Sequence, residues 1–169
     1  MPAATNLSDV RVSAKATKLR STLSFARPAD TTVYAANDVI FESSDPGVLC
    51  FTSAGVSGFI RGATCVMNQV AATDLLLLIF DEEPTSFADN ASVALVQADW
   101  DKLVAAFFLP TADKRSAAAT VRVYETAARI PVAYTASAGG KLYGLLVTPT
   151  GFTPAASVVF ALSIHLEID

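Results

Sequence analysis

Alternation of apolar and polar positions is clearest in the C-terminal stretch, residues 157–169. Every even position from Val158 to Ile168 is apolar, whereas most of the odd positions are small or polar. Because successive side chains of a strand point to opposite faces, this pattern predicts a long strand with one face in a core. Such a strand needs partner strands at its edges and a second layer over its apolar face.

Shorter apolar or alternating runs predict more strands. Gly, Pro and Asn-Asp signals separate these runs, which cover residues 39–41, 48–52, 59–66, 74–80, 104–109, 120–125, 131–136 and 141–148. The run at 74–80 is continuously apolar, so we expect it to be covered on both faces. Two glycines at 139–140 favour a hairpin turn, because glycine accepts positive φ.

The N-terminal quarter has a weaker pattern. Residues 10–25 alternate loosely and change parity near Thr17, which favours a bulge, although a helix over residues 14–23 competes with a strand there. Residues 1–24 are therefore expected to form an N-terminal arm or the first strand. Residues 25–169 are expected to form a single β-sandwich domain.

These elements together predict the fold class. Eight or nine strands, with at most a short helix near residues 97–103, favour an all-β antiparallel sandwich, with a jelly roll as the preferred arrangement. A chain of 169 residues with 52% hydrophobic side chains suits one domain with a sizeable core. Only 17% of the side chains are charged, which favours apolar surface left over for another subunit.

Charge is distributed unevenly around a net value of −4. One acid and five basic residues lie within positions 1–27, so the rest of the chain carries −8. That acidic bulk argues against a nucleic-acid partner. The basic residues either form a docking arm or an ordinary solvated strand face. They are Arg11, Lys15, Lys18, Arg20 and Arg27.

Candidate catalytic and metal-binding residues are few. Cys50 and Cys65, with the single histidine His165, are too few for a structural zinc site, and we expect two buried free thiols. His165 is expected at a surface or interface rather than as a base or ligand. The acids at 81–83 lack calcium-loop spacing and favour a solvated loop. We expect no cofactor, no metal and no enzymatic activity.

Three further features bear on binding and location. Trp100 stands between two acids, as in some sugar-binding sites, but the preferred interpretation is a core aromatic that points inward. The N-terminus lacks a charged-then-apolar pattern, so no signal peptide is expected. No apolar run approaches the length that crosses a membrane, so we expect no membrane partner.

Three segments carry a family resemblance. The run at 25–39 contains Arg-Pro-Ala-Asp-Thr-Thr, then Tyr-Ala-Ala, then Asp-Val. Residues 58–61 read Gly-Phe-Ile-Arg, and residues 151–157 read Gly-Phe-Thr-Pro-Ala-Ala-Ser before the last strand. The chain from Phe25 to Ile168 thereby resembles a family of tailed-bacteriophage virion proteins. Asn37 stands where that pattern has Gly, a change that left-handed backbone geometry tolerates.

The resemblance implies a structural function. It implies a capsid cement or decoration protein that stabilises the head shell, with the major capsid protein and further copies of itself (a homotrimer or homodimer) as partners. Such a protein is made in the host cytoplasm and is located on the capsid surface of the virion, and the five basic residues become a candidate capsid-docking arm. The alternative is a tail- or fibre-associated jelly-roll module that binds host carbohydrate.

Overall fold

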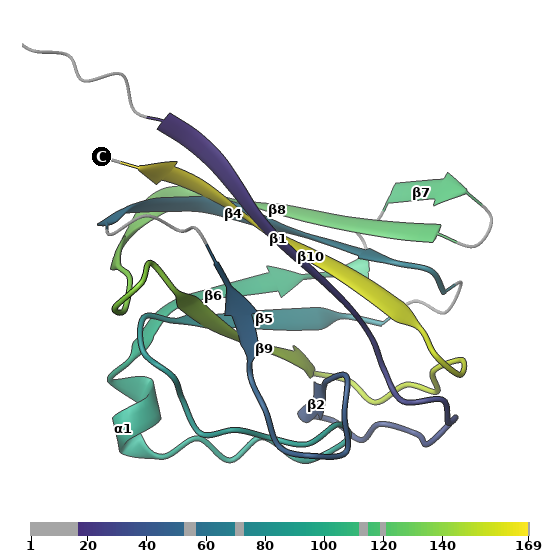
Figure 1. Ribbon diagram of the computed structural model, residues 1–169. Coiled ribbons are helices and arrows are strands. Elements are labelled where there is room, and N and C mark those ends of the chain that lie inside the picture. Colours follow the sequence, from purple (N-terminus) through teal and green to yellow (C-terminus); the bar gives the residue numbers. More distant parts are fainter. Residues whose placement is uncertain (1–16, 53–56, 70–72, 112–114, 119–120, 169) are drawn as a thin grey trace, which may run out of the picture.

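Two antiparallel sheets pack face to face to form a sandwich (Figure 1). The computed structural model describes residues 17–52, 57–69, 73–111, 115–118 and 121–168. The elements in chain order are β1 (Thr17–Ala26), β2 (Asp38–Ile40), β3 (Leu49–Phe51), β4 (Ser57–Met67), β5 (Leu75–Phe80), α1 (Gln97–Trp100), β6 (Leu103–Leu109), β7 (Arg115–Ala118), β8 (Val121–Thr135), β9 (Leu142–Thr148) and β10 (Val159–Ile168). The all-β prediction is confirmed.

Strand pairing follows the jelly-roll pattern. One sheet has the order β1-β10-β4-β8-β7, and the other has the order β2-β9-β5-β6, with β3 also paired to β9. The pairs are nested in sequence: β5 with β6 is innermost, followed by β4 with β8, then β2 and β3 with β9, then β1 with β10. Successive pairs belong to alternate sheets, as expected when one long hairpin is rolled into a sandwich.

The alternation in β10 decides which face is buried. Phe160, Leu162 and Ile164 are fully buried, whereas Val159, on the opposite face, is 37% exposed. The apolar residues of both sheets form a single core cluster. In β5, only Leu76 is partly exposed, so the prediction that this strand is covered on both faces is also confirmed.

The structure differs from the sequence-based interpretation at two strands. Residues 120–125 and 131–136 were expected as separate strands, but β8 runs through Val121–Thr135 as one strand. Its register against β4 shifts where Ile60 pairs with Val132 and Gly62 with Ala127, so an irregularity replaces the expected break. Proline was the misleading signal, because Pro131 is accommodated within this irregular strand.

β1 corrects the interpretation of the N-terminal quarter. It pairs with β10 over its full length, from Thr17 to Ala26, so residues 17–23 are strand and the competing helix is wrong there. The expected boundary after residue 24 falls inside β1, which makes this segment part of the sandwich. Residues 1–16 lie outside the described part of the chain.

Turns and the short helix mostly follow prediction. Gly139 and Gly140 have φ of 87° and 70° in the expected hairpin, and Asn37 takes φ of 68°. The helix near residues 97–103 is confirmed as α1, a single turn. No helix in the described ranges has both the length and the apolar character needed to cross a membrane.

Trp100 does not point into the core. It is 51% exposed, so the prediction of an inward aromatic is wrong. The physical reason is that Asp99 takes the inward position of this one-turn helix. Its carboxylate accepts hydrogen bonds from the backbone N–H and hydroxyl of Thr85 and from the N–H of Val96. Burial alone would raise the pKa of Asp99, but these hydrogen bonds lower it overall.

Truncation on the two faces of β10 is expected to have unequal effects. Ile164→Ala leaves a cavity in the core and should lower the free energy of unfolding by about 2–5 kcal/mol. Val159→Ala, on the outer face of the same strand, should change it by less than about 1 kcal/mol. Urea unfolding of both variants checks this, and equal losses would contradict the assigned register.

Candidate functional site

Arg27 lies at the centre of a polar network, which we call the corner network: Arg27, Tyr34 and Asp89, whose side chains are buried, and Asp30, whose side chain is 47% exposed. The Arg27 side chain is fully buried. Its Nε donates to the Tyr34 hydroxyl at 2.9 Å, and its Nη2 pairs with Asp30 at 2.8 Å and with Asp89 at 3.4 Å. Its Nη1 donates to the Asp30 carbonyl oxygen at 2.6 Å. Each nitrogen of this buried cation therefore has an acceptor.

Tyr34 connects the cation to the second carboxylate. Its hydroxyl donates to Asp89 Oδ1 at 2.6 Å, and the same oxygen accepts the N–H of Phe41 at 2.8 Å. Burial and then the hydrogen bond to Asp89 raise the pKa of Tyr34, which keeps the hydroxyl protonated as a donor. Burial opposes the charge on Arg27, but its bonds to Tyr34 and Asp30 raise the guanidinium pKa overall.

The C-terminal segment that carries the family resemblance packs on this network. The rings of Tyr34 and Phe152 stack with centroids 5.0 Å apart, and the Tyr34 N–H donates to the Phe152 carbonyl at 3.0 Å. A Cβ atom at Gly151 would lie 2.6 Å from the Tyr34 carbonyl oxygen, so only glycine fits without a shift. The matched runs at 25–39 and 151–157 are therefore parts of one structural unit.

Arg27 cannot act as a docking residue. Its expected place in a capsid-docking arm is wrong, because its guanidinium is buried and bound to two carboxylates and a phenol. Exposing it would leave Asp89 buried without its partner, at high energetic cost. Arg11 and Lys15 lie outside the described residues.

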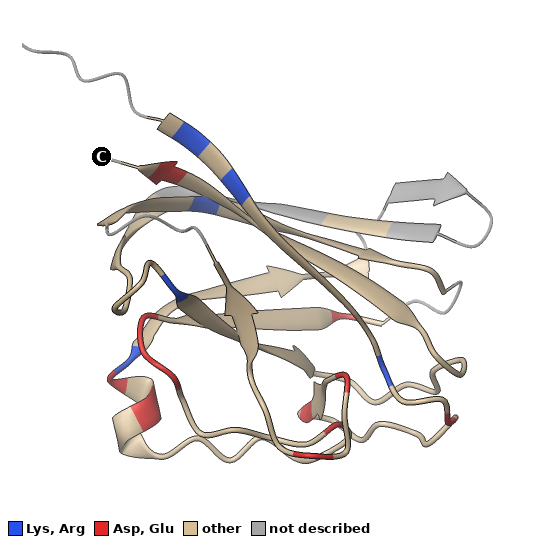
Figure 2. Ribbon diagram, viewed as in Figure 1, with Lys and Arg blue, Asp and Glu red and all other residues tan. Residues whose placement is uncertain are grey.

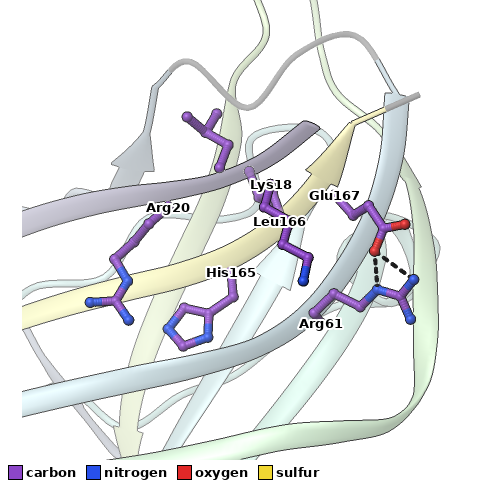
Figure 3. Close-up of a pocket in the computed structure, with 7 residues that line it drawn as sticks. Lys18, Arg20, Arg61, His165, Leu166 and Glu167 are labelled. Atoms are coloured by element: carbon purple, nitrogen blue, oxygen red, sulfur yellow. Dashed lines mark hydrogen bonds and ion pairs between the residues drawn. The ribbon is translucent and has the colours of Figure 1, made fainter. Parts of the chain in front are cut away.

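The other two basic candidates line an open hollow of about 630 Å³ on the outer face of the first sheet (Figure 3). We call this hollow the basic pocket. It is lined by Lys18, Leu19, Arg20, Arg61, His165, Leu166 and Glu167, from β1, β4 and β10. The odd-numbered face of β10, expected to meet solvent or a neighbouring subunit, forms its floor.

Strand register brings these side chains together. Lys18 is opposite Glu167, and Arg20 is opposite His165, so alternate residues of both strands point outward. Arg61 is the extra residue of a bulge, because the register passes from Ile60 to Gly62 while β10 advances by one position. The glycine after Arg61 was the available signal for this bulge, but sequence reasoning missed both Arg61 and Glu167 as pocket residues.

Positive charge exceeds negative charge in the pocket. Arg61 pairs with Glu167, with 2.6 Å between Nε and Oε2 and 2.5 Å between Nη2 and Oε2. Glu167 is the only acidic residue among the lining side chains, and neither Lys18 nor Arg20 forms an ion pair within the described ranges. His165 Nε2 lies 2.9 Å from the Thr64 hydroxyl. The pocket can therefore attract an anionic group to two exposed cations.

The remaining sequence candidates are not brought together. Cys65 is buried on the inner face of β4, opposite the outward face that holds His165, and burial raises the pKa of its thiol. Cys50 lies on β3 in the other sheet. Within the described ranges, no group of three or more His, Cys, Asp or Glu side chains is arranged to hold a metal ion. The acids at 81–83 lie in the loop that follows β5.

Two arginine substitutions separate the corner network from the basic pocket. Arg27→Met should lower the free energy of unfolding by about 3–5 kcal/mol, because it leaves a buried carboxylate without its cation. Arg20→Met, at an exposed position, should change it by about 0.5 kcal/mol or less. Chemical denaturation with circular dichroism measures both, and a mild effect at Arg27 would refute a structural function for the network.

The described part of the chain thus has two polar features of different kinds, the corner network and the basic pocket. The corner network holds Arg27 and Asp89 buried and supplies their partners from within the chain, so it acts on stability. The basic pocket is open and carries cations without partners among the described residues, so it is the better candidate for binding. The chain matches no family model, and no curated protein matches it.

Proposed function

We propose that the protein is a structural component of a tailed-phage virion, a cement or decoration protein that binds the outer surface of the head shell. One observation carries the proposal. Two of the three sequence runs on which the resemblance rests belong to one packed unit around Arg27, although Arg27 and Ala155 are 128 positions apart. Residues that match a family pattern and also contact each other support a shared fold better than scattered matches do.

The proposed mechanism is stabilisation by protein–protein contact. The major capsid protein and further copies of this chain are the proposed partners, and the capsid surface of the virion is the proposed location. A standard interface buries about 1,600 Å² and gives micromolar to picomolar affinity, depending on its anchor residues. Among the described residues, five large apolar side chains are exposed and available for such contacts. They are Val33, Val96, Trp100, Phe108 and Val159.

Binding to the shell is the direct test. The purified protein should sediment with expanded capsids in a saturable ratio and raise the melting temperature of the shell, because an added interface stabilises the bound state. An unrelated jelly-roll protein of similar charge, run in parallel, controls for trapping. Protein that stays in the supernatant and leaves shell melting unchanged would overturn the proposal.

A second candidate function has one observation in its favour. Trp100 is 51% exposed at the end of α1, with Asp101 exposed beside it, and an open indole face beside a carboxylate can stack on a sugar ring. This favours the alternative of a tail- or fibre-associated module that binds host carbohydrate.

Trp100 separates the two candidates because little packing depends on it. Trp100→Ala should alter the free energy of unfolding by about 1 kcal/mol or less. If the protein decorates the shell, a glycan array should show no signal for wild type or variant. A wild-type signal that Trp100→Ala abolishes and Trp100→Phe retains would instead establish the carbohydrate function.

A further inference from the structure

Basic and acidic side chains are unevenly distributed over the described part of the molecule (Figure 2). The outer face of the first sheet carries Lys18, Arg20 and Arg61 around the basic pocket. Acidic side chains gather instead on the loops and on α1, beside the second sheet. One group of them forms a corner at the end of β5, which we call the acidic corner. It consists of Asp81, Glu82, Glu83, Trp100 and Asp101.

The loop of the acidic corner is held by bonds that leave the carboxylates of Glu82 and Glu83 available. The N–H of Asp81 donates to the Lys102 carbonyl at 3.2 Å, and Lys102 Nζ donates to the Glu83 carbonyl oxygen at 2.8 Å. These bonds use the backbone of the loop. Glu82 and Glu83 are exposed, and neither forms an ion pair with any described residue.

The chemistry of the basic pocket indicates what it binds. Its own ion pair joins the Arg61 guanidinium to the Glu167 carboxylate, so a carboxylate already fits one of its cations. Lys18 lies opposite Glu167 and Arg20 lies opposite His165, and both cations are exposed. Carboxylates supplied from outside would meet them without displacing Glu167.

We propose that the basic pocket of one copy receives the acidic corner of a second copy. Both surfaces belong to the same chain, so every copy presents a cationic receptor and an anionic ligand of matching chemistry. Glu82 and Glu83 of the second copy would pair with Lys18 and Arg20. Trp100, exposed at the same corner, adds apolar area and can stack on a guanidinium.

The contact is heterologous, because the two patches differ. Such contacts form closed rings when the rotation between copies closes, and open chains when it does not. Exposed ion pairs are individually weak and are screened by salt. The association is therefore expected to be weak and salt-sensitive. Raising the salt from about 0.05 M to about 0.5 M should increase the dissociation constant at least about tenfold.

Charge reversal on each surface tests the contact by sedimentation velocity. The pocket variant carries Lys18→Glu and Arg20→Glu, and the corner variant carries Glu82→Lys and Glu83→Lys. Each variant alone should associate at least about tenfold more weakly than wild type. A mixture of the two variants should associate again, because the unchanged corner of one meets the unchanged pocket of the other, and the two reversed surfaces also carry opposite charge.

A variant with all four reversals should regain self-association, because the two signs are exchanged together. All four positions are exposed, and unchanged melting temperatures would exclude unfolding as the cause of any loss. A wild-type protein that stays monomeric at low salt would overturn the proposal. So would association that the pocket variant leaves intact.

The capsid shell is the rival occupant. If the pocket variant loses shell binding while the corner variant keeps it and wild type stays monomeric, the shell occupies the pocket and the proposal is wrong. The inference rests on the proposed function only for its setting in a virion. Sedimentation uses the isolated protein, so failure of self-association and failure of shell binding are separate results.

Discussion

The pairing of β10 with β1 on one edge and β4 on the other is the constraint on which the rest of the structure depends. One register places Phe160, Leu162 and Ile164 in the core and aligns His165 with Arg20. A slip of one residue would exchange the two faces, exposing the apolar side chains and burying the charged ones. The register that buries the apolar face of β10 therefore also positions the side chains of the basic pocket.

The corner network imposes a second constraint, at the end of the sandwich. A buried guanidinium is tolerated only when its donors are satisfied, so the segments that supply its acceptors must stay together. Asp30 and Tyr34 come from the turn after β1, and Asp89 comes from the loop before α1. Stacking of Tyr34 on Phe152 adds the segment that leads into β10. The network thereby ties three loops together.

Stability and binding are assigned to different residues of one basic segment. Arg27, just after β1, is directed inward and stabilises the fold. Lys18 and Arg20, both on β1, are directed outward. The difference follows from position: the outward side chains lie where β1 alternates against β10, and Arg27 lies just beyond the end of the strand, where the chain turns.

The sequence by itself determined the fold class, most strands, the hairpin at Gly139–Gly140 and the buried face of β10. These features depend on local alternation and turn chemistry, which the chain displays directly. It did not determine that Arg27 is buried, because that depends on its ion pair with Asp89, which is distant in sequence. It did not determine that Trp100 is exposed either, because that follows from the hydrogen bond of Thr85 to the neighbouring Asp99. Nor did it reveal the pocket. Arg61 joins Lys18 and Arg20 only through a bulge and a pairing across three strands, and only the tertiary structure brings these together.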